Sequence, residues 1–276
     1  MSLATTTLAA RELPPPAIRR WNRQRVLGHA LLALWGLLGL ALIVYLVRAW
    51  NADLFARYAP AYLSGLLVTL ELVGISVALG TILSLPIAFA RMSANRALAW
   101  PAYAYVYFFR GTPLLAQAFL VYYGLGQFRP QLEAVGLWVF FREAWWCAIL
   151  AFTLNTAAYQ AEIVRGAVES VPKGQWEGAA SLGLPRWLTF RRIIAPQAMI
   201  VALRPYGNEI ILMIKGSAIV AIITVYDLMG ETRRAFSRTF DFQTYIWAAV
   251  IYLVLVEVLR IATDRIERSI TRHLRR

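Results

Sequence analysis

Five charged residues interrupt the long apolar runs of this 276-residue sequence: Glu71, Arg110, Glu162, Glu209 and Lys215. A charge inside the apolar interior of a membrane is costly, so each of them is a candidate functional residue. Glu209 stands deepest between the ends of its apolar run. We expect its carboxylate, and the ammonium group of Lys215, either to pair with another span or to face a central cavity.

Spacing narrows the roles of the other charges. Glu162 and Arg165 are three residues apart, which is the spacing of neighbours on one helix face, and we expect a local ion pair. Glu209 and Lys215 are six residues apart and do not face each other on one helix. Arg110 precedes Gly111-Thr112-Pro113, where a helix can break. We favour a role for Arg110 in holding the freed carbonyl groups over a place in the pathway.

Enzyme chemistry is not indicated. The sequence has two lysines, Lys173 and Lys215, and neither is followed by the Ser or Thr that a phosphate-binding Walker A motif requires. The two histidines, His29 and His273, lie near the two ends and do not predict a metal site. We therefore expect this chain to bind no metal and no cofactor of its own.

The elements that carry these charges are long apolar runs. Hydrophobic residues make up 59% of the chain and the mean hydropathy is +0.55, which is typical of a membrane protein. We predict an all-α protein with a Pro-rich basic tail at 1–27, an extra N-terminal span within 28–49, a main transmembrane domain at 60–264 and a basic tail at 265–276. The predicted spans cover residues 30–47, 62–90, 97–126, 144–164, 197–226 and 242–260.

The charge balance predicts the orientation. The net charge of +13 would suggest nucleic-acid binding in a soluble protein, but here the basic residues gather in the segments between spans. Most of them fall in both tails and in the segment 165–196, and cytoplasmic segments are the ones enriched in Lys and Arg. We therefore predict a multi-pass protein of the bacterial inner membrane, in contact with lipid and not nucleic acid, with both termini in the cytoplasm.

The segment 172–196 is predicted to project between two spans. Pro172 marks the start of a helix over 173–182, Gly183 suits the position after its end, and Pro185 suits the first turn of a second helix over 185–193. Gly178, Ala179 and Ala180 would give this projection a flat face for a partner. Four apolar side chains are expected to anchor it to the membrane domain: Trp176, Leu182, Trp187 and Phe190. The alternative is an amphipathic hairpin that lies on lipid, with Arg186, Arg191 and Arg192 at the phosphates.

The same segment resembles a known motif. Glu177-Gly178-Ala179, followed by Gly183, Ile193 and Pro196, is similar to the EAA loop of ABC importer permeases, which usually has Ala at the position of Gly178. The stretches 109–125, 152–175 and 206–219 resemble the polar amino-acid uptake branch of that class. The stretch 140–159 is similar to the M-type permease of histidine, lysine–arginine–ornithine and opine systems, and the resemblance covers about residues 60–270.

The resemblance implies a type I ABC importer transmembrane domain of five spans, with the extra N-terminal span added. It implies that the loop forms coupling helices that dock on a cytoplasmic ABC ATPase dimer, where ATP-Mg is bound. The implied coupling residues are Glu177, Gly178, Ala179, Ala180, Gly183, Ile193 and Pro196. It further implies a periplasmic amino-acid-binding protein, a second permease chain, with a Q-type heterodimer favoured over a homodimer, and a cargo that is a cationic amino acid or an opine.

Two other classes remain open from the residues alone. An ion-coupled secondary transporter would use the intramembrane charges as a proton relay, but it would not need the projecting loop at 175–196. A membrane enzyme would need a cluster of catalytic side chains, which the sequence does not indicate.

Overall fold

A computed structural model describes residues 22–274, and every regular element in that range is helical. Residues 1–21 and 275–276, which hold most of the predicted N-terminal tail and the end of the C-terminal one, lie outside the described residues. The longer helices are α1 (Arg23–Ala49), α2 (Ala52–Arg91), α3 (Arg96–Gly111), α7 (Ala144–Glu169), α10 (Ala195–Ser217), α11 (Leu228–Thr239) and α12 (Gln243–Ile270). The shorter ones are α4 (Leu114–Phe119), α5 (Arg129–Ala134), α6 (Trp138–Phe141), α8 (Lys173–Ser181) and α9 (Arg186–Thr189), with π-helical turns η1 (Leu120–Gly124) and η2 (Phe190–Ile194) and 3₁₀ turns η3 (Ala218–Ile223) and η4 (Thr271–Leu274).

Five helical stretches are long and apolar enough to cross a membrane, judged by length and composition among the described residues. They are Arg23–Arg48, Ala52–Arg91, Ala144–Glu169, Arg186–Ile223 and Gln243–Ile270. The span predicted at 97–126 is wrong as a single element. It is split into α3 and the pair α4–η1, because the chain leaves the helical conformation at Thr112 and Pro113.

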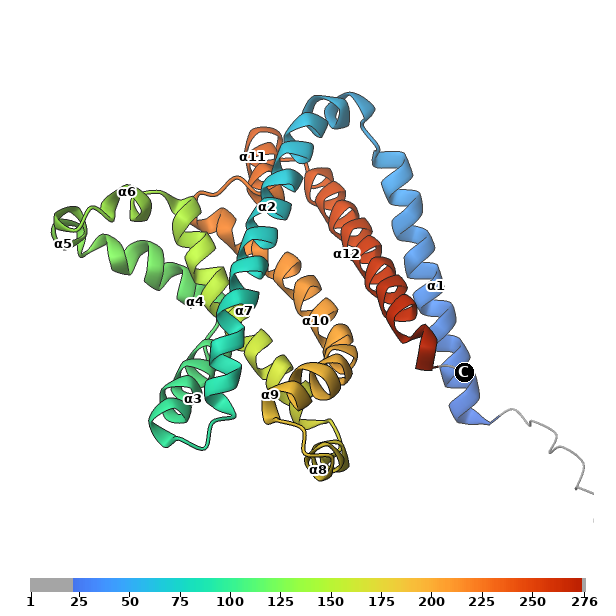
Figure 1. The fold of residues 1–276 in the computed structure, drawn as a ribbon. Coiled ribbons are helices and arrows are strands. Elements are labelled where there is room, and N and C mark those ends of the chain that lie inside the picture. Colours follow the sequence, from blue (N-terminus) through green and yellow to red (C-terminus); the bar gives the residue numbers. More distant parts are fainter. Residues whose placement is uncertain (1–21, 275–276) are drawn as a thin grey trace, which may run out of the picture. The chain divides into compact units, whose positions relative to one another are not determined.

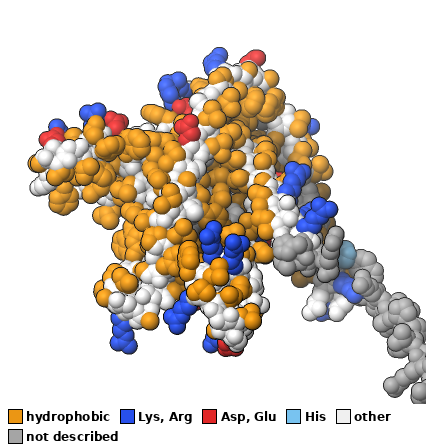
Figure 2. All heavy atoms as spheres, in the orientation of Figure 1, with side chains coloured by type: hydrophobic (Ala, Val, Ile, Leu, Met, Phe, Trp, Pro, Cys, Tyr) orange, Lys and Arg blue, Asp and Glu red, His pale blue; other side chains and the backbone are white. Residues whose placement is uncertain are grey.

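The chain divides into two compact units, Met1–Trp50 and Asn51–Arg276. In the first unit, α1 is a helix of 27 residues with a mean hydropathy of 2.5 over its apolar stretch. In the second unit, α2, α7 and α10 form the centre. The segment 172–196, named the coupling segment after its predicted role, leads into the start of α10, where α8 and α9 are labelled (Figure 1). Hydrophobic side chains cover much of the face shown in Figure 2, as expected for a surface that meets lipid.

Close packing of α2 against α7 depends on small residues. A Cβ atom at Gly80 would lie 2.4 Å from Cγ2 of Thr156 and 3.3 Å from the backbone nitrogen of Ala157. Leu72 on α2 and Phe152 on α7 are fully buried and belong to one hydrophobic core cluster. In a membrane, such close approach is a main source of helix association, because lipid removes most of the hydrophobic driving force between helices.

The start of α11 is also fixed by a polar side chain. Oδ1 of Asp227 accepts a hydrogen bond from the Gly230 nitrogen at 2.8 Å, which caps the first turn. The backbone carbonyl of Asp227 lies against α2 at Gly65, where a Cβ atom would be 2.8 Å from it. Burial raises the pKa of the Asp227 carboxyl to about 6.

We expect Gly80→Val to weaken the contact between α2 and α7. The added side chain would overlap Thr156, and overpacking of this kind costs about 1–3 kcal/mol. Thermal unfolding of the purified protein in detergent should show a lower midpoint than the parent. The matched control is Gly74→Val on the same helix, since a Cβ atom there meets nothing within 4 Å. Equal midpoints for the two variants would contradict the packing argument.

Candidate functional site

The break between α3 and α4 is held open by two amide side chains. Thr112 and Pro113 have extended backbone conformations, so the carbonyl groups before them lose helical partners. Nε2 of Gln117 donates to the Phe109 carbonyl at 2.9 Å and to the Thr112 carbonyl at 3.1 Å. Nδ2 of Asn155 donates to the same Phe109 carbonyl at 3.1 Å and to Oε1 of Gln117 at 3.0 Å. The amides satisfy the freed carbonyls, so the expectation that Arg110 does so is wrong.

Neither amide was singled out from the sequence. The signal for Asn155 was present: it belongs to a group of polar residues in the apolar run that forms α7, which also includes Thr153, Thr156 and Gln160. These four residues are buried in the structure. A polar group that repeats within an otherwise apolar span indicates a face directed at other helices, not at lipid.

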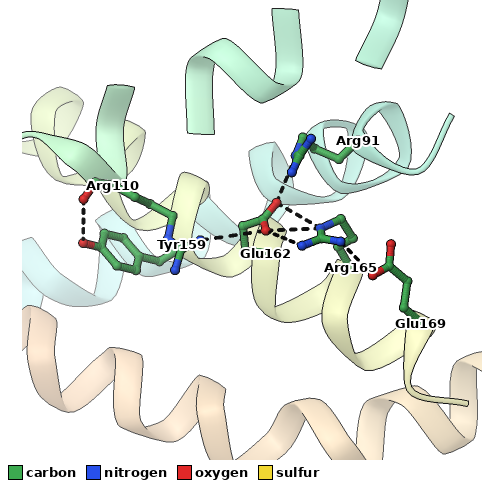
Figure 3. Close-up of polar contacts among 6 residues, drawn as sticks. All are labelled: Arg91, Arg110, Tyr159, Glu162, Arg165 and Glu169. Atoms are coloured by element: carbon green, nitrogen blue, oxygen red, sulfur yellow. Dashed lines mark hydrogen bonds and ion pairs between the residues drawn. The ribbon is translucent and has the colours of Figure 1, made fainter. Parts of the chain in front are cut away.

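Glu162 on α7 is the centre of an ion cluster (Figure 3). Nη2 of Arg165 lies 2.7 Å from its Oε2, which confirms the predicted local pair. Nε of Arg91, at the end of α2, lies 3.0 Å from Oε1, and Nη1 of Arg110, at the end of α3, lies 3.8 Å from Oε2. Arg165 also contacts Glu169 at 2.7 Å. One carboxylate therefore links three helices.

Arg110 is directed into open space as well as toward Glu162. Its guanidinium lies over the ring of Tyr159 at 5.2 Å, and its side chain is 44% exposed. It lines a cavity of about 490 Å³ together with Arg91, Tyr103 and Glu162. It also lines a second cavity of about 460 Å³, whose lining continues through the break to Pro113 and Leu114.

The second cavity contains Glu209. This residue is 5% exposed, and one carboxylate oxygen accepts a hydrogen bond from Oγ1 of Thr156 at 3.2 Å. No ion pair to Glu209 forms among the described residues, so the expected pairing with a basic residue of another span is not found there. The cavity brings together α3, α4, α7 and α10; its lining includes Arg110, Thr112, Asn155, Tyr159, Glu209 and Met213.

The two remaining candidates lie elsewhere. Lys215, near the end of α10, is exposed and makes no ion pair within residues 22–274, so its predicted partner on another span is also not found. It does not line the cavity that contains Glu209. Glu71 is exposed on α2 and lines a separate recess of about 480 Å³ with Arg142, Glu143 and Tyr226.

The coupling segment has the predicted first helix. Helix α8 ends at Ser181, and Gly183 follows with a φ of +72°, a conformation that glycine adopts easily. The Gly183 amide donates to the Ala180 carbonyl at 2.9 Å, and the Leu184 amide donates to the Ala179 carbonyl at 3.1 Å. These bonds satisfy the last carbonyl groups of the helix.

Two details of this segment differ from the prediction. The second helix does not end at 193, because α9 continues through the π-helical turn η2 into α10. The flat face is smaller than expected: Gly178 and Ala180 are exposed, but Ala179 is buried at 3% exposure. Successive residues on a helix point in different directions, which explains why three adjacent positions do not share one face.

Two of the four expected anchors are also wrong. Trp176 and Phe190 pack against a buried cluster around Val171 and Ile194, as an anchor requires. Leu182 and Trp187 are 79% and 69% exposed in the isolated chain. Of the other predicted coupling residues, Glu177 and Pro196 are exposed and Ile193 is half-buried.

Comparison with known proteins places this arrangement in a family. Residues 76–275 match the family described as the binding-protein-dependent transport system inner membrane component. The chain belongs to this family, and so its fold is that of a membrane component of a transport system. More narrowly, it is a permease subunit of the ABC importer class, which does not carry the ATPase. The ion-coupled secondary transporter is therefore not retained.

Three relatives support this placement. The nopaline transport system permease protein of Agrobacterium fabrum is 44% identical over 210 residues, which cover 76% of this chain and 87% of that protein. The arginine ABC transporter permease protein of Haemophilus influenzae is 37% identical over 218 residues, which cover 79% and 95%. A crystal structure of an amino acid ABC transporter with histidines aligns with a TM-score of 0.72 and 35% identity, covering 80% of this chain and 99% of that one.

We expect Asn155→Leu to destabilise the site. The change leaves the buried Oε1 of Gln117 without its donor, and an unsatisfied buried polar group costs about 1–3 kcal/mol. The control is Thr153→Val, two residues away on α7, because the buried Oγ1 of Thr153 has no hydrogen-bond partner among the described residues. Thermal unfolding in detergent should show a clear loss for Asn155→Leu and little change for Thr153→Val. A larger loss for Thr153→Val would contradict the stabilising role assigned to the hydrogen bond between Asn155 and Gln117.

Proposed function

We propose that this permease carries a cationic amino acid or an arginine-derived opine. The observation that carries the proposal is the buried carboxylate of Glu209, which lines a cavity of about 460 Å³ and has no ion-pair partner among the described residues. A buried carboxylate without a close ion pair is costly to ionise, and a cationic cargo would supply a close partner. The relatives named for nopaline and arginine transport support this class of cargo.

The same cavity is lined by two side chains of opposite charge. Glu209 lies on α10, and Arg110 lies at the end of α3 beside the break. A cavity with one acidic and one basic side chain suits a zwitterion that also carries a cationic side chain. We therefore assign the translocation pathway to this cavity, with Glu209 and Arg110 as its charged lining. Lys215, which is exposed outside the cavity, remains a further pathway candidate in the assembled transporter.

The coupling segment is proposed to receive the ATPase. Its exposed Gly178 and Ala180 permit the close approach of another protein. Its exposed Leu182 and Trp187 are apolar side chains that a partner protein could cover. The excess of basic residues in the segment 165–196 and in both tails supports a cytoplasmic position for this loop and for both termini. The buried Ala179 then supports the loop from inside and does not itself contact the ATPase.

The remaining parts of the assembly follow from the class. We propose that a periplasmic amino-acid-binding protein delivers the cargo, and that ATP-Mg binds on an ATPase dimer. A second permease chain completes the pathway, and the similarity to M-type chains favours a Q-type heterodimer over a homodimer. Closure of the ATPase dimer would move the coupling segments together, and rigid-body rotation of the helices would alternate access between the two sides of the membrane.

Glu209→Gln tests the cargo class. The amide oxygen of Gln can still accept the hydrogen bond from Thr156, so we expect the transporter to assemble. Uptake of radiolabelled L-arginine into proteoliposomes that contain the complete complex should fall about tenfold or more, because a charge-assisted contact is lost. The control is Glu71→Gln, which lies in a separate recess. Unchanged uptake by the Glu209 variant, in a complex that assembles normally, would contradict the proposed cargo.

Gly178→Trp tests the coupling assignment. A Cβ atom at Gly178 meets nothing within 4 Å in this chain, so the variant should fold, but its indole would obstruct a docked ATPase. We expect reduced co-purification of the ATPase and loss of transport. Gly28→Trp on α1, where a Cβ atom also meets nothing within 4 Å, serves as the control. A Gly178 variant with normal ATPase binding and normal transport would rule out docking at this position.

A further inference from the structure

Arg110 stands between two cavities. The cavity of about 490 Å³ and the cavity of about 460 Å³ share three consecutive lining residues: Arg110, Gly111 and Thr112. Glu162 lines only the first cavity and Glu209 lines only the second. The guanidinium of Arg110 can therefore be reached by a small ligand from either cavity, as its exposed fraction of 44% also indicates.

Glu162 does not need Arg110 for its neutralisation. Arg91 contacts this carboxylate at 3.0 Å, and Arg165 contacts it through two nitrogens, at 2.7 Å for Nη2 and 3.1 Å for Nε. Arg110, at 3.8 Å, is the most distant of the three, and it makes no hydrogen bond to Glu162. Because two arginines already satisfy the carboxylate, the departure of Arg110 leaves no buried unpaired acid.

Hydrogen bonds hold the backbone on both sides of Arg110, while its side chain makes weak contacts. The carbonyls of Phe109 and Thr112, which flank it, accept hydrogen bonds from Asn155 and Gln117. The guanidinium itself rests on the Tyr159 ring at 5.2 Å (Figure 3). A guanidinium on a fixed backbone, with a weak partner and open space in front of it, is suited to bind a carboxylate in a bidentate manner.

We propose that Arg110 binds the α-carboxylate of the cargo, and that this contact replaces its 3.8 Å contact with Glu162. The ligand class is an L-amino acid or opine with a free carboxylate, bound with its cationic side chain toward Glu209. This inference rests on the proposed function and adds a second point of recognition to it. Arg91 and Arg165 then act as positioning residues, because they hold Glu162 and leave Arg110 available.

The test compares two ligands that differ only in the carboxylate. Isothermal titration calorimetry of the purified complete complex in detergent should measure the Kd of L-arginine and of agmatine, which is decarboxylated arginine. Arg110→Gln should weaken L-arginine binding by about tenfold or more, the effect of a lost charge-assisted contact, while agmatine binding changes little. Arg129→Gln, on the short helix α5, is the control for loss of an exposed arginine. An equal loss for both ligands in the Arg110 variant would overturn the inference.

Arg91→Gln provides an independent measurement. With Arg91 removed, Glu162 draws more strongly on Arg110, so L-arginine binding should weaken by a few-fold while agmatine binding stays close to that of the parent. Equal changes for the two ligands, or no change for either, would overturn the exchange between Glu162 and the cargo. If the parent complex binds neither ligand, the proposed cargo class fails and the inference fails with it. If the parent complex binds L-arginine but the variants do not show the expected differences, the inference fails and the proposed cargo class stands.

Discussion

The need to satisfy backbone polar groups inside a membrane governs the candidate site. A helix that stops at Gly111 and resumes at Leu114 leaves carbonyl groups without helical partners, and inside a membrane protein such groups need other donors. The amides of Gln117 and Asn155 meet that need, and they do so from two different helices. The break therefore requires α7 to lie beside α3 and α4 in one register. With that register set, Arg110 is placed between the two cavities and close to Glu162.

The polar interior of the helical unit follows from the same requirement. Helix α7 turns Asn155, Thr156 and Gln160 toward its neighbours, and α2 meets it through Gly80, where a larger residue would collide. Small residues bring the helices close, and hydrogen bonds then hold them, which is how membrane helices associate without a strong hydrophobic effect. Glu162 adds an ionic link among α2, α3 and α7.

Much of the fold could be predicted from the sequence, because long apolar runs have few alternatives to helices. The local pair of Glu162 with Arg165 was also predictable, since it depends only on a spacing of three residues. The contacts of Arg91 and Arg110 with Glu162 were not, because they join helices that are distant in the sequence. The exposure of Trp187 and the burial of Ala179 were missed for a related reason: composition does not show which way a short helix faces. The coupling and pathway roles stay predictions.

The cluster around Glu162 has unequal tolerance to genetic change. Three arginines surround one acid, so the loss of a single arginine still leaves that acid paired. Loss of the acid instead leaves three cations near one another, and among the described residues Arg165 would keep its ion pair with Glu169 while Arg91 would lose its own. By charge balance alone, the cluster should therefore tolerate the loss of Arg91 or Arg165 better than the loss of the glutamate, while Arg110 is also needed for its proposed contact with the cargo. The ion pairing of the cluster thus depends on Glu162, although Glu162 does not line the cavity of Glu209 and Arg110 does.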